Sequence, residues 1–222
     1  MATYALIHGA GDVGWYWHLV ERELHDRGHQ TVAPDLPIED DDATLIHNAQ
    51  VVLDAIGRTD DGGELVVVGQ SYGGYIAPIV AERACADRLI LVAPMILSPG
   101  ETADEMWEAT GWQMPRSDSG AIGACYHDVD PVVAAEAMSR ERRQSETTGR
   151  EPWPLAAWPD VPTHVIIGRS DRFFPADWLR GVVRARLGTE PDELPSGHTP
   201  ALSRPAELVH LMESYRQSDE AR

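Results

Sequence analysis

One short stretch of the sequence places a serine between glycines at a spacing typical of a catalytic nucleophile. Gly69-Gln70-Ser71-Tyr72-Gly73 follows the apolar run LVVV and precedes a helical pattern. A serine on a sharp strand-to-helix turn exposes its hydroxyl, and the flanking glycines leave room for the tight backbone. The helix behind it directs backbone N–H groups and a positive dipole end at the reacting centre. We therefore predict a nucleophile at Ser71; a simple glycine-rich turn is the alternative.

A serine nucleophile needs a base, and the sequence offers nine histidines. His198 lies in a turn-rich loop (196–200, SGHTP) between the last expected strand and the last helix, whereas most others fall on helices or at the wrong end of a strand. By elimination, we predict that His198 is the base. The acid should lie between nucleophile and base in the chain. Asp171, just past an apolar strand, is our prediction, with Glu101 and Asp104 as weaker rivals.

The first turn, residues 8–14 (HGAGDVG), allows two interpretations. Its glycines have the G-x-G-x-x-G spacing of a dinucleotide-binding turn, and Asp35 lies where an acidic residue would hold a ribose. Against this, three bulky aromatic residues directly follow the last glycine. If the first and third strands are neighbours, the turn instead faces Ser71, and the backbone N–H groups of Ala10 and Tyr72 form an oxyanion hole. We favour this second interpretation.

These positions require a sheet that brings several loops to one edge. Apolar runs bounded by turn residues predict strands at 4–8, 30–34, 65–69, 89–93 and 163–167, and a short one at 190–194. Because the runs suit burial on both faces, the sheet should be mainly parallel. Helical patterns lie at 15–27, 43–57, 73–85, 131–143, 176–187 and 204–216. The predicted fold class is α/β, a doubly wound sheet of about six strands in a single domain, residues 1–222.

The connection between strands 89–93 and 163–167 is several times longer than one crossover helix needs. We therefore predict an inserted helical cap at about 95–160, not a second domain. Its large apolar side chains predict a mainly apolar substrate pocket, although packing of the cap onto the core would explain each of them equally well. These candidate pocket residues are Met95, Met106, Trp107, Trp112 and Tyr126.

Composition excludes several classes of function. The net charge is −18, which opposes binding to nucleic acid or an anionic membrane. All 18 basic residues are arginine, so mechanisms that need lysine are excluded. Cys85 and Cys125 form no metal or redox motif. We expect no signal peptide, because a strand-like run without the basic and long apolar regions of such a peptide begins almost at once. We expect a cytoplasmic protein acting on a small molecule without metal or cofactor; both a monomer and a homodimer are compatible.

The motifs HGAG, GQSYGG, GRSDRFFP and SGHTPALSRPAEL, in this order, resemble those of α/β-hydrolases over nearly the whole chain. More narrowly, the chain is similar to small hydrolases related to plant methylesterases and hydroxynitrile lyases, which carry a cap segment like 125–128 (CYHD). The resemblance implies Ser71 as nucleophile, His198 as base and Asp171 as acid. It also implies Ala10 and Tyr72 as oxyanion donors.

Three departures from that group bear on the reaction. Gln70 replaces a histidine beside the nucleophile, Asp12 replaces a histidine of the plant members, and Thr199 follows His198 where cyanogenic lyases carry lysine. Because the chain has no lysine, cyanohydrin cleavage is disfavoured. The implied function is a serine hydrolase that cleaves a carboxylic ester or thioester of a small, mainly apolar substrate through an acyl-enzyme. Lyase, cyclase or thioesterase duty in a biosynthetic pathway, and non-catalytic ligand binding, remain as alternatives.

Overall fold

The computed structural model describes residues 1–57, 63–113 and 120–220, and this part of the chain forms a six-stranded parallel sheet. The strands are β1 (Ala2–Ile7), β2 (Gln30–Val32), β3 (Glu64–Gln70), β4 (Arg88–Val92), β5 (Thr163–Gly168) and β6 (Asp192–Leu194). Their order is β2-β1-β3-β4-β5-β6. Ile7 pairs with Gly69, and Gln70 pairs with Val92, so the carboxyl ends of the three central strands lie together. A doubly wound sheet binds ligands at this edge, where the winding reverses between β1 and β3.

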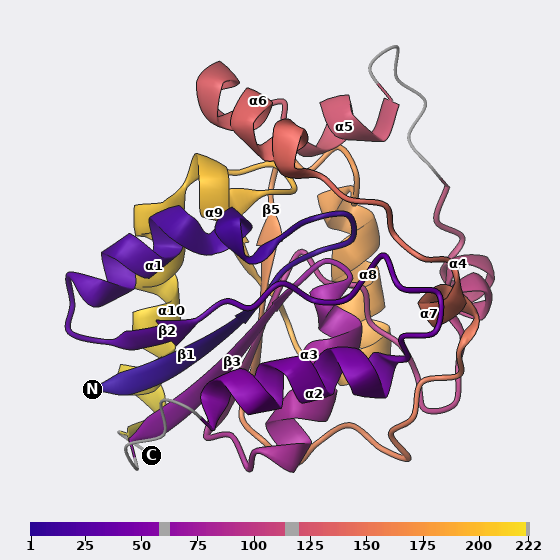
Figure 1. Ribbon diagram of the computed structural model, residues 1–222, viewed down its shortest axis with the longest axis horizontal. Coiled ribbons are helices and arrows are strands. Elements are labelled where there is room, and N and C mark those ends of the chain that lie inside the picture. Colours follow the sequence, from indigo (N-terminus) through magenta and orange to yellow (C-terminus); the bar gives the residue numbers. More distant parts are fainter. Residues whose placement is uncertain (58–62, 114–119, 221–222) are drawn as a thin grey trace.

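Helices cover both faces of the sheet (Figure 1). On one face α2 (Leu45–Ile56), α3 (Gly73–Arg83) and α8 (Ala176–Leu187) bury apolar side chains in one core cluster. On the other face η1 (Gly14–Trp17), α1 (His18–His25), α9 (Pro200–Ser203) and α10 (Pro205–Glu220) enclose a second cluster. The central strands β1 and β4 are buried along their whole length, as expected for strands packed between two helical layers.

Most predicted elements are confirmed, including the short sixth strand, with two corrections. The helix expected at 15–27 begins as the 3-10 helix η1 and continues as α1, which ends at His25. The helix expected at 131–143 is α6 (Pro131–Arg140), three residues shorter. It ends early because the backbone turns extended at Glu141, and the Arg142 N–H donates to the Gly11 carbonyl (2.7 Å) instead of continuing the helix.

The segment between β4 and β5 carries four short helices in its described parts. They are α4 (Ala103–Thr110), α5 (Gly120–Cys125), α6 and α7 (Thr147–Arg150). Thr102 begins α4 with a reciprocal capping box to Glu105, and the Asp130 carboxylate caps α6 just before Pro131. Figure 1 shows α5 and α6 beyond α9, while α4 lies beside α7. We call this segment, residues 95–160, the cap; its predicted extent stays a prediction.

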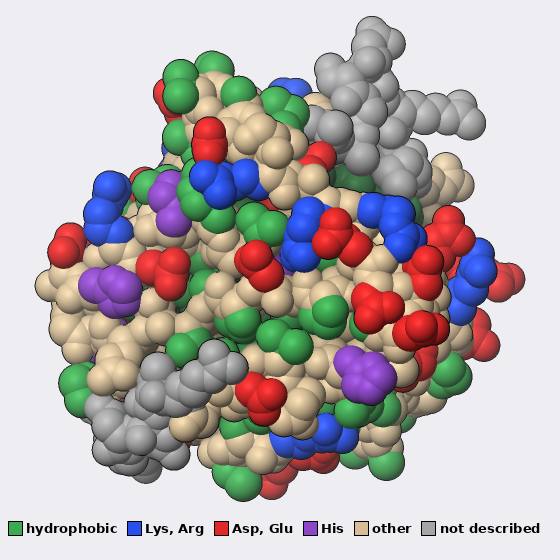
Figure 2. Space-filling view, viewed as in Figure 1, with side chains coloured by type: hydrophobic (Ala, Val, Ile, Leu, Met, Phe, Trp, Pro, Cys, Tyr) green, Lys and Arg blue, Asp and Glu red, His purple; other side chains and the backbone are tan. Residues whose placement is uncertain are grey.

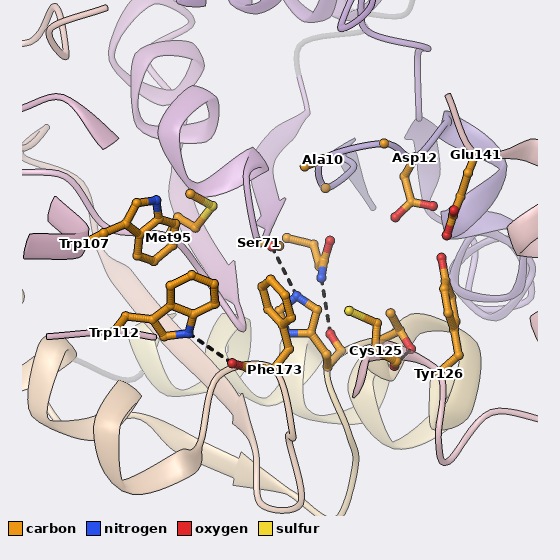
Figure 3. A pocket seen from close by; sticks show the side chains of 15 residues that line it. Ala10, Asp12, Ser71, Met95, Trp107, Trp112, Cys125, Tyr126, Glu141 and Phe173 are labelled. Atoms are coloured by element: carbon orange, nitrogen blue, oxygen red, sulfur yellow. Dashed lines mark hydrogen bonds between the residues drawn. The ribbon is translucent and has the colours of Figure 1, made fainter. Parts of the chain in front are cut away.

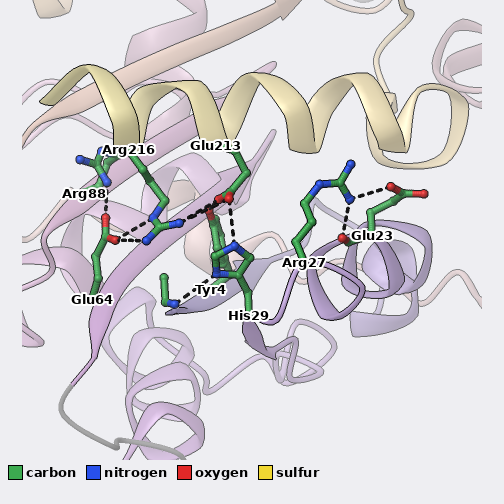
Figure 4. A network of polar contacts seen from close by, with 9 residues as sticks. Tyr4, Glu23, Arg27, His29, Glu64, Arg88, Glu213 and Arg216 are labelled. Carbon is green, nitrogen blue, oxygen red and sulfur yellow. Dashed lines mark hydrogen bonds and ion pairs between the residues drawn. The ribbon is translucent and has the colours of Figure 1, made fainter. Parts of the chain in front are cut away.

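A polar network joins α10 to the amino ends of the strands, at the end of the sheet opposite the carboxyl ends (Figure 4). Glu213 accepts hydrogen bonds from the Tyr4 hydroxyl and from His29 Nε2 (2.9 Å). The His29 Nδ1 accepts the Ala2 N–H (3.1 Å), which places the ring proton on Nε2. Arg216 links Glu213 to Glu64 at the start of β3. The network contacts only elements far from the carboxyl edge, so its role is structural.

The face of the molecule seen in Figure 2 carries both acidic and arginine side chains. Among the residues that the structure describes, no helix has the length and apolar character needed to cross a bilayer.

Candidate active site

Ser71 lies on a strained turn between β3 and α3. Its φ of 50° is in the left-handed region, which is costly for a residue other than glycine. Glycine is required on both sides, because a Cβ at Gly69 would lie 2.6 Å from the Gly73 oxygen. A Cβ at Gly73 would lie 2.7 Å from the Ile7 oxygen of β1. The close approach of β1, β3 and α3 thus explains the predicted glycine spacing and leaves the serine at the head of the helix.

Ser71, His198 and Asp171 form one hydrogen-bonded chain. His198 Nδ1 lies 2.9 Å from Asp171 Oδ2, and His198 Nε2 lies 3.2 Å from Ser71 Oγ. Because a carboxylate can only accept, the ring proton belongs on Nδ1, and Nε2 is left to accept the serine proton. The structure brings together the three residues that the sequence singled out. Their catalytic roles stay predictions.

Asp171 is itself held in place by the backbone. Its Oδ1 accepts the N–H groups of Phe173 (2.8 Å) and Phe174 (2.9 Å), and the rings of these two residues flank His198 at centroid distances of 4.8 and 5.0 Å. All three members of the chain are buried, and Ser71 and His198 reach the cavity described below. The rival Glu101 is engaged elsewhere, in an ion pair with Arg186.

The first turn faces Ser71, as the oxyanion interpretation requires. Ala10 lines the same cavity as Ser71, and neither its N–H nor that of Tyr72 has an acceptor among the described residues. His8 supports the turn: its Nε2 accepts the Leu36 N–H (3.0 Å), so its Nδ1–H donates to the Gly9 oxygen (2.9 Å). Burial lowers the pKa of His8 to about 4, which keeps the ring neutral.

The dinucleotide interpretation of the first turn loses its two supports. Asp35 accepts the Gly14 N–H (2.7 Å) and so fastens the turn to β2. A Cβ at Gly14 would lie 1.9 Å from the Ala33 oxygen, so packing against the neighbouring strand end explains this glycine. The third glycine of the pattern therefore serves the fold.

A cavity of about 380 Å³ opens above Ser71. Aromatic and thioether side chains form one wall: Met95, Trp107, Trp112 and Phe173 (Figure 3). The ring centroids of Trp107 and Trp112 lie 4.5 Å apart, and Trp112 Nε1 donates to the Phe173 carbonyl (3.1 Å). Of the five residues predicted for the pocket, Met95, Trp107, Trp112 and Tyr126 line it. Met106 does not, because its side chain points from α4 into the core. A second cavity of about 430 Å³ shares Ala10, Met95 and Trp107 with the first.

The opposite wall of this cavity is polar, and Tyr126 is its one residue that was predicted for the pocket. Asp12, Cys125, Tyr126 and Glu141 line it, and Figure 3 shows the Asp12, Tyr126 and Glu141 side chains converging. Burial, and next the charge of Glu141, raise the pKa of Asp12 to about 7. Burial also raises the pKa of Glu141, and raises that of the Cys125 thiol to about 12. For the two carboxyl groups, the only sequence signal was that Asp12 departs from the plant pattern; nothing marked Glu141.

The cap also holds the loops that carry the catalytic candidates. Asp128 accepts the Gly197 N–H (2.6 Å), next to His198. The Thr199 hydroxyl donates to the Cys125 carbonyl (2.9 Å), on the other side of the same histidine. His127 Nε2 lies 2.9 Å from the Ser170 carbonyl, beside Asp171. The segment 125–128 therefore fixes both the base and the acid loop.

Comparison with known proteins agrees with this architecture. A family model described as "Alpha/beta hydrolase family" matches residues 5–211. Solved structures with the same fold include polyneuridine aldehyde esterase (TM-score 0.81, 15% identity, covering 97% of this chain and 99% of that one). Another is the methylesterase MES16 from Arabidopsis (TM-score 0.80, 16% identity, covering 98% and 99%). The predicted fold class is thus confirmed.

Curated relatives are more similar in sequence, but several of them match over a shorter stretch. A probable esterase, PIR7A of Oryza sativa, is 30% identical over 87 residues, which cover 36% of this chain and 33% of that protein. The alpha/beta hydrolase nvfD of Aspergillus novofumigatus is 24% identical over 229 residues, 89% of each chain. The first of these matches spans only about a third of the relative's length.

Proposed function

The chain belongs to the alpha/beta hydrolase family, and from this premise we propose that it is a serine ester hydrolase. The observation that carries the proposal is the hydrogen-bonded chain from Ser71 through His198 to Asp171 at the floor of an open cavity. Solved structures of the same fold include esterases. In this proposal the ester, or thioester, is small and has an apolar portion that contacts the aromatic wall.

In the proposed reaction, Ser71 Oγ attacks the substrate carbonyl while its proton passes to His198 Nε2. Asp171 stabilises the imidazolium that forms and holds the ring in the required tautomer. The developing oxyanion accepts hydrogen bonds from the Ala10 and Tyr72 N–H groups, a type of contact worth roughly 3 kcal/mol per donor. His198 then protonates the leaving alcohol or thiol, and the acyl group stays on Ser71.

The second half of the reaction reverses these proton transfers. His198 takes a proton from a water molecule that attacks the acyl-Ser71 carbonyl, and it returns that proton to Ser71 as the acid leaves. Cys125 lines the same cavity but does not compete as a nucleophile, because its raised pKa keeps the thiol protonated. We propose a soluble small-molecule enzyme of the cytoplasm, without a nucleic-acid or membrane partner.

Replacing Ser71 by alanine tests the proposal. We expect S71A to lose at least about 10³-fold in kcat/KM on a short p-nitrophenyl ester, because the residual activity would come from binding and the oxyanion hole alone. A fluorophosphonate probe should label the wild type but not S71A. Ser139, exposed on α6, supplies the control S139A, which should keep both properties. Full activity of S71A, or labelling of it, would overturn the assignment.

A further inference from the structure

The two walls of the cavity differ in charge as well as polarity. Met95, Trp107 and Trp112 lie on one side of Ser71 in Figure 3, and Asp12, Tyr126 and Glu141 lie on the other. We call the second set, together with Gln70, the acidic wing. It combines two carboxyl groups with a phenol, an unusual lining for a pocket that would receive a purely apolar ester.

A backbone clamp brings the two carboxyl groups of the acidic wing together. The Arg142 N–H donates to the Gly11 carbonyl (2.7 Å), so the cap residue before it, Glu141, lies against the turn that carries Asp12. The charge of the Arg142 guanidinium acts to lower the pKa of Asp12, but Arg142 does not line the cavity. Its Nη2 donates to the carbonyls of Asp12 and Leu36 (both 3.0 Å) and its Nη1 contacts Glu39 (3.3 Å). The guanidinium therefore braces the loops and leaves the carboxyl groups to the cavity.

Gln70 gives independent evidence that this side of the cavity receives hydrogen-bond donors. Its side chain is 1% exposed and lines the cavity beside Ser71. The Nε2 atom donates to the His198 carbonyl (3.2 Å), but Oε1 has no partner among the described residues. A buried carbonyl oxygen without a partner costs free energy unless a ligand or water supplies a donor. Gln70 Oε1, packed beside Gly9, is thus an unpartnered acceptor in the cavity lining.

We propose that the acidic wing binds a cationic ammonium group of the substrate, so that the preferred ester carries a basic amine. This inference rests on the proposed ester hydrolysis and names its substrate class. An ammonium group supplies only donors and a positive charge, which complements two carboxyl groups and the Gln70 oxygen. Burial, and next the charge of Glu141, raise the pKa of Asp12, and a cation bound between the two carboxyl groups would offset both effects. The net charge of −18 would also attract cations over a longer range.

Matched esters test the proposal directly. The aromatic acyl group of phenylacetate suits the wall of Trp107 and Trp112, so the pair is 2-(dimethylamino)ethyl phenylacetate and its neutral isostere 3-methylbutyl phenylacetate. A second pair places the amine in the acyl part. We expect kcat/KM to favour the ammonium ester at least about tenfold in one of the two pairs, equivalent to about 1.4 kcal/mol. Assays in about 0.5 M NaCl screen the long-range field and leave the contribution of the cavity.

Variants locate the origin of the preference. In the double variant D12N/E141Q the ratio of the two kcat/KM values should fall at least about tenfold, with the single variants in between. E136Q, which removes an exposed carboxylate from α6 of the same cap, should leave the ratio unchanged. Equal kcat/KM values within both pairs for the wild type would overturn the proposal, and so would a preference that survives in D12N/E141Q.

A binding measurement separates this proposal from the proposed reaction. The amides N-[2-(dimethylamino)ethyl]phenylacetamide and N-(3-methylbutyl)phenylacetamide resist hydrolysis, and calorimetry can compare their affinities for the wild-type protein. If neither ester is hydrolysed, the proposed function fails, and the two amides still test the acidic wing. If both esters are hydrolysed equally well and the amides bind equally, only the cationic subsite fails.

Discussion

Replacing Asp12 by asparagine should stabilise the protein, and more so at neutral pH than in acid. Burial, and next the charge of Glu141, raise the pKa of Asp12 from 3.8 to about 7. Between these two pH values the folded chain retains a proton that the unfolded chain has released. The free energy of unfolding therefore falls as the pH rises through this interval, and it stays lower above the folded pKa.

The magnitude follows from the separation of the two pKa values. One pKa unit corresponds to about 1.4 kcal/mol, so the interval from 3.8 to about 7 corresponds to at most roughly 4 kcal/mol. Water in the open cavity solvates the half-buried carboxyl group and reduces this figure. Asparagine keeps the shape of the side chain and does not ionise. We therefore expect D12N to match the wild type near pH 4 and to exceed its stability by about 2 kcal/mol near pH 8.

Urea unfolding followed by tryptophan fluorescence, repeated from about pH 4 to about pH 8, measures this difference. The control is D54N, since Asp54 lies on the exposed side of α2, where its carboxylate accepts a hydrogen bond from Gln50 (2.8 Å). D54N should follow the wild type across the whole range. Parallel curves for the wild type and D12N, or a D12N protein that is the less stable one near pH 8, would refute the reasoning.

Three further predictions concern other parts of the molecule. D128N weakens the hold on the Gly197 N–H beside His198 and should lower kcat about tenfold with little change in KM, measured by steady-state hydrolysis. Gly73→Ala should cost about 3 kcal/mol in urea unfolding because its Cβ meets the β1 backbone, whereas Gly181→Ala, in open space on α8, should gain about 0.5 kcal/mol. Glu213→Gln should cost about 1–2 kcal/mol by the same measurement and leave kcat unchanged, because its network lies at the opposite end of the strands.

Each of these has a clear contrary result. An unchanged kcat in D128N would show that the cap does not position the base loop. Equal stabilities of the Gly73→Ala and Gly181→Ala proteins would contradict the close approach of β1 and α3. A loss of kcat in Glu213→Gln would mean that the network at the amino ends reaches the catalytic edge.

The sheet and the three catalytic candidates were predictable because each depends on a local signal. Runs such as LVVV and LILV predict buried strands, and the end of each run marks the carboxyl end of the strand. Ser71 and Asp171 follow such strands closely, so topology alone brings them to one edge. His198 was found by elimination, and the glycines at 69 and 73 carry a steric requirement that any sequence with this turn must meet.

The end of α6 and the pairing of Asp12 with Glu141 were not predictable, because both depend on contacts between segments far apart in the sequence. The end of α6 depends on hydrogen bonds that Arg142 makes to distant backbone carbonyls. One of these carbonyls belongs to Asp12, about 130 residues away in the sequence. Helical periodicity contains no information about such a partner. Glu141 is likewise one of many surface-type carboxylates in an acidic chain, and only the fold places it opposite Asp12.

The cap and the sheet are coupled through the backbone, which bears on how specificity could change in this chain. The cap contributes Glu141 and all of the aromatic wall except Phe173. It also holds the His198 loop through Asp128 and the first turn through Arg142. A substitution that moves the cap would therefore disturb the base and the Ala10 N–H together with the pocket. A side-chain change such as E141Q leaves these backbone contacts in place, because Glu141 contributes its side chain to the cavity and the clamp uses the backbone of Arg142. Substrate preference should accordingly be altered with least loss of turnover by single side chains of the acidic wing, and with most loss by insertions or deletions between α6 and β5.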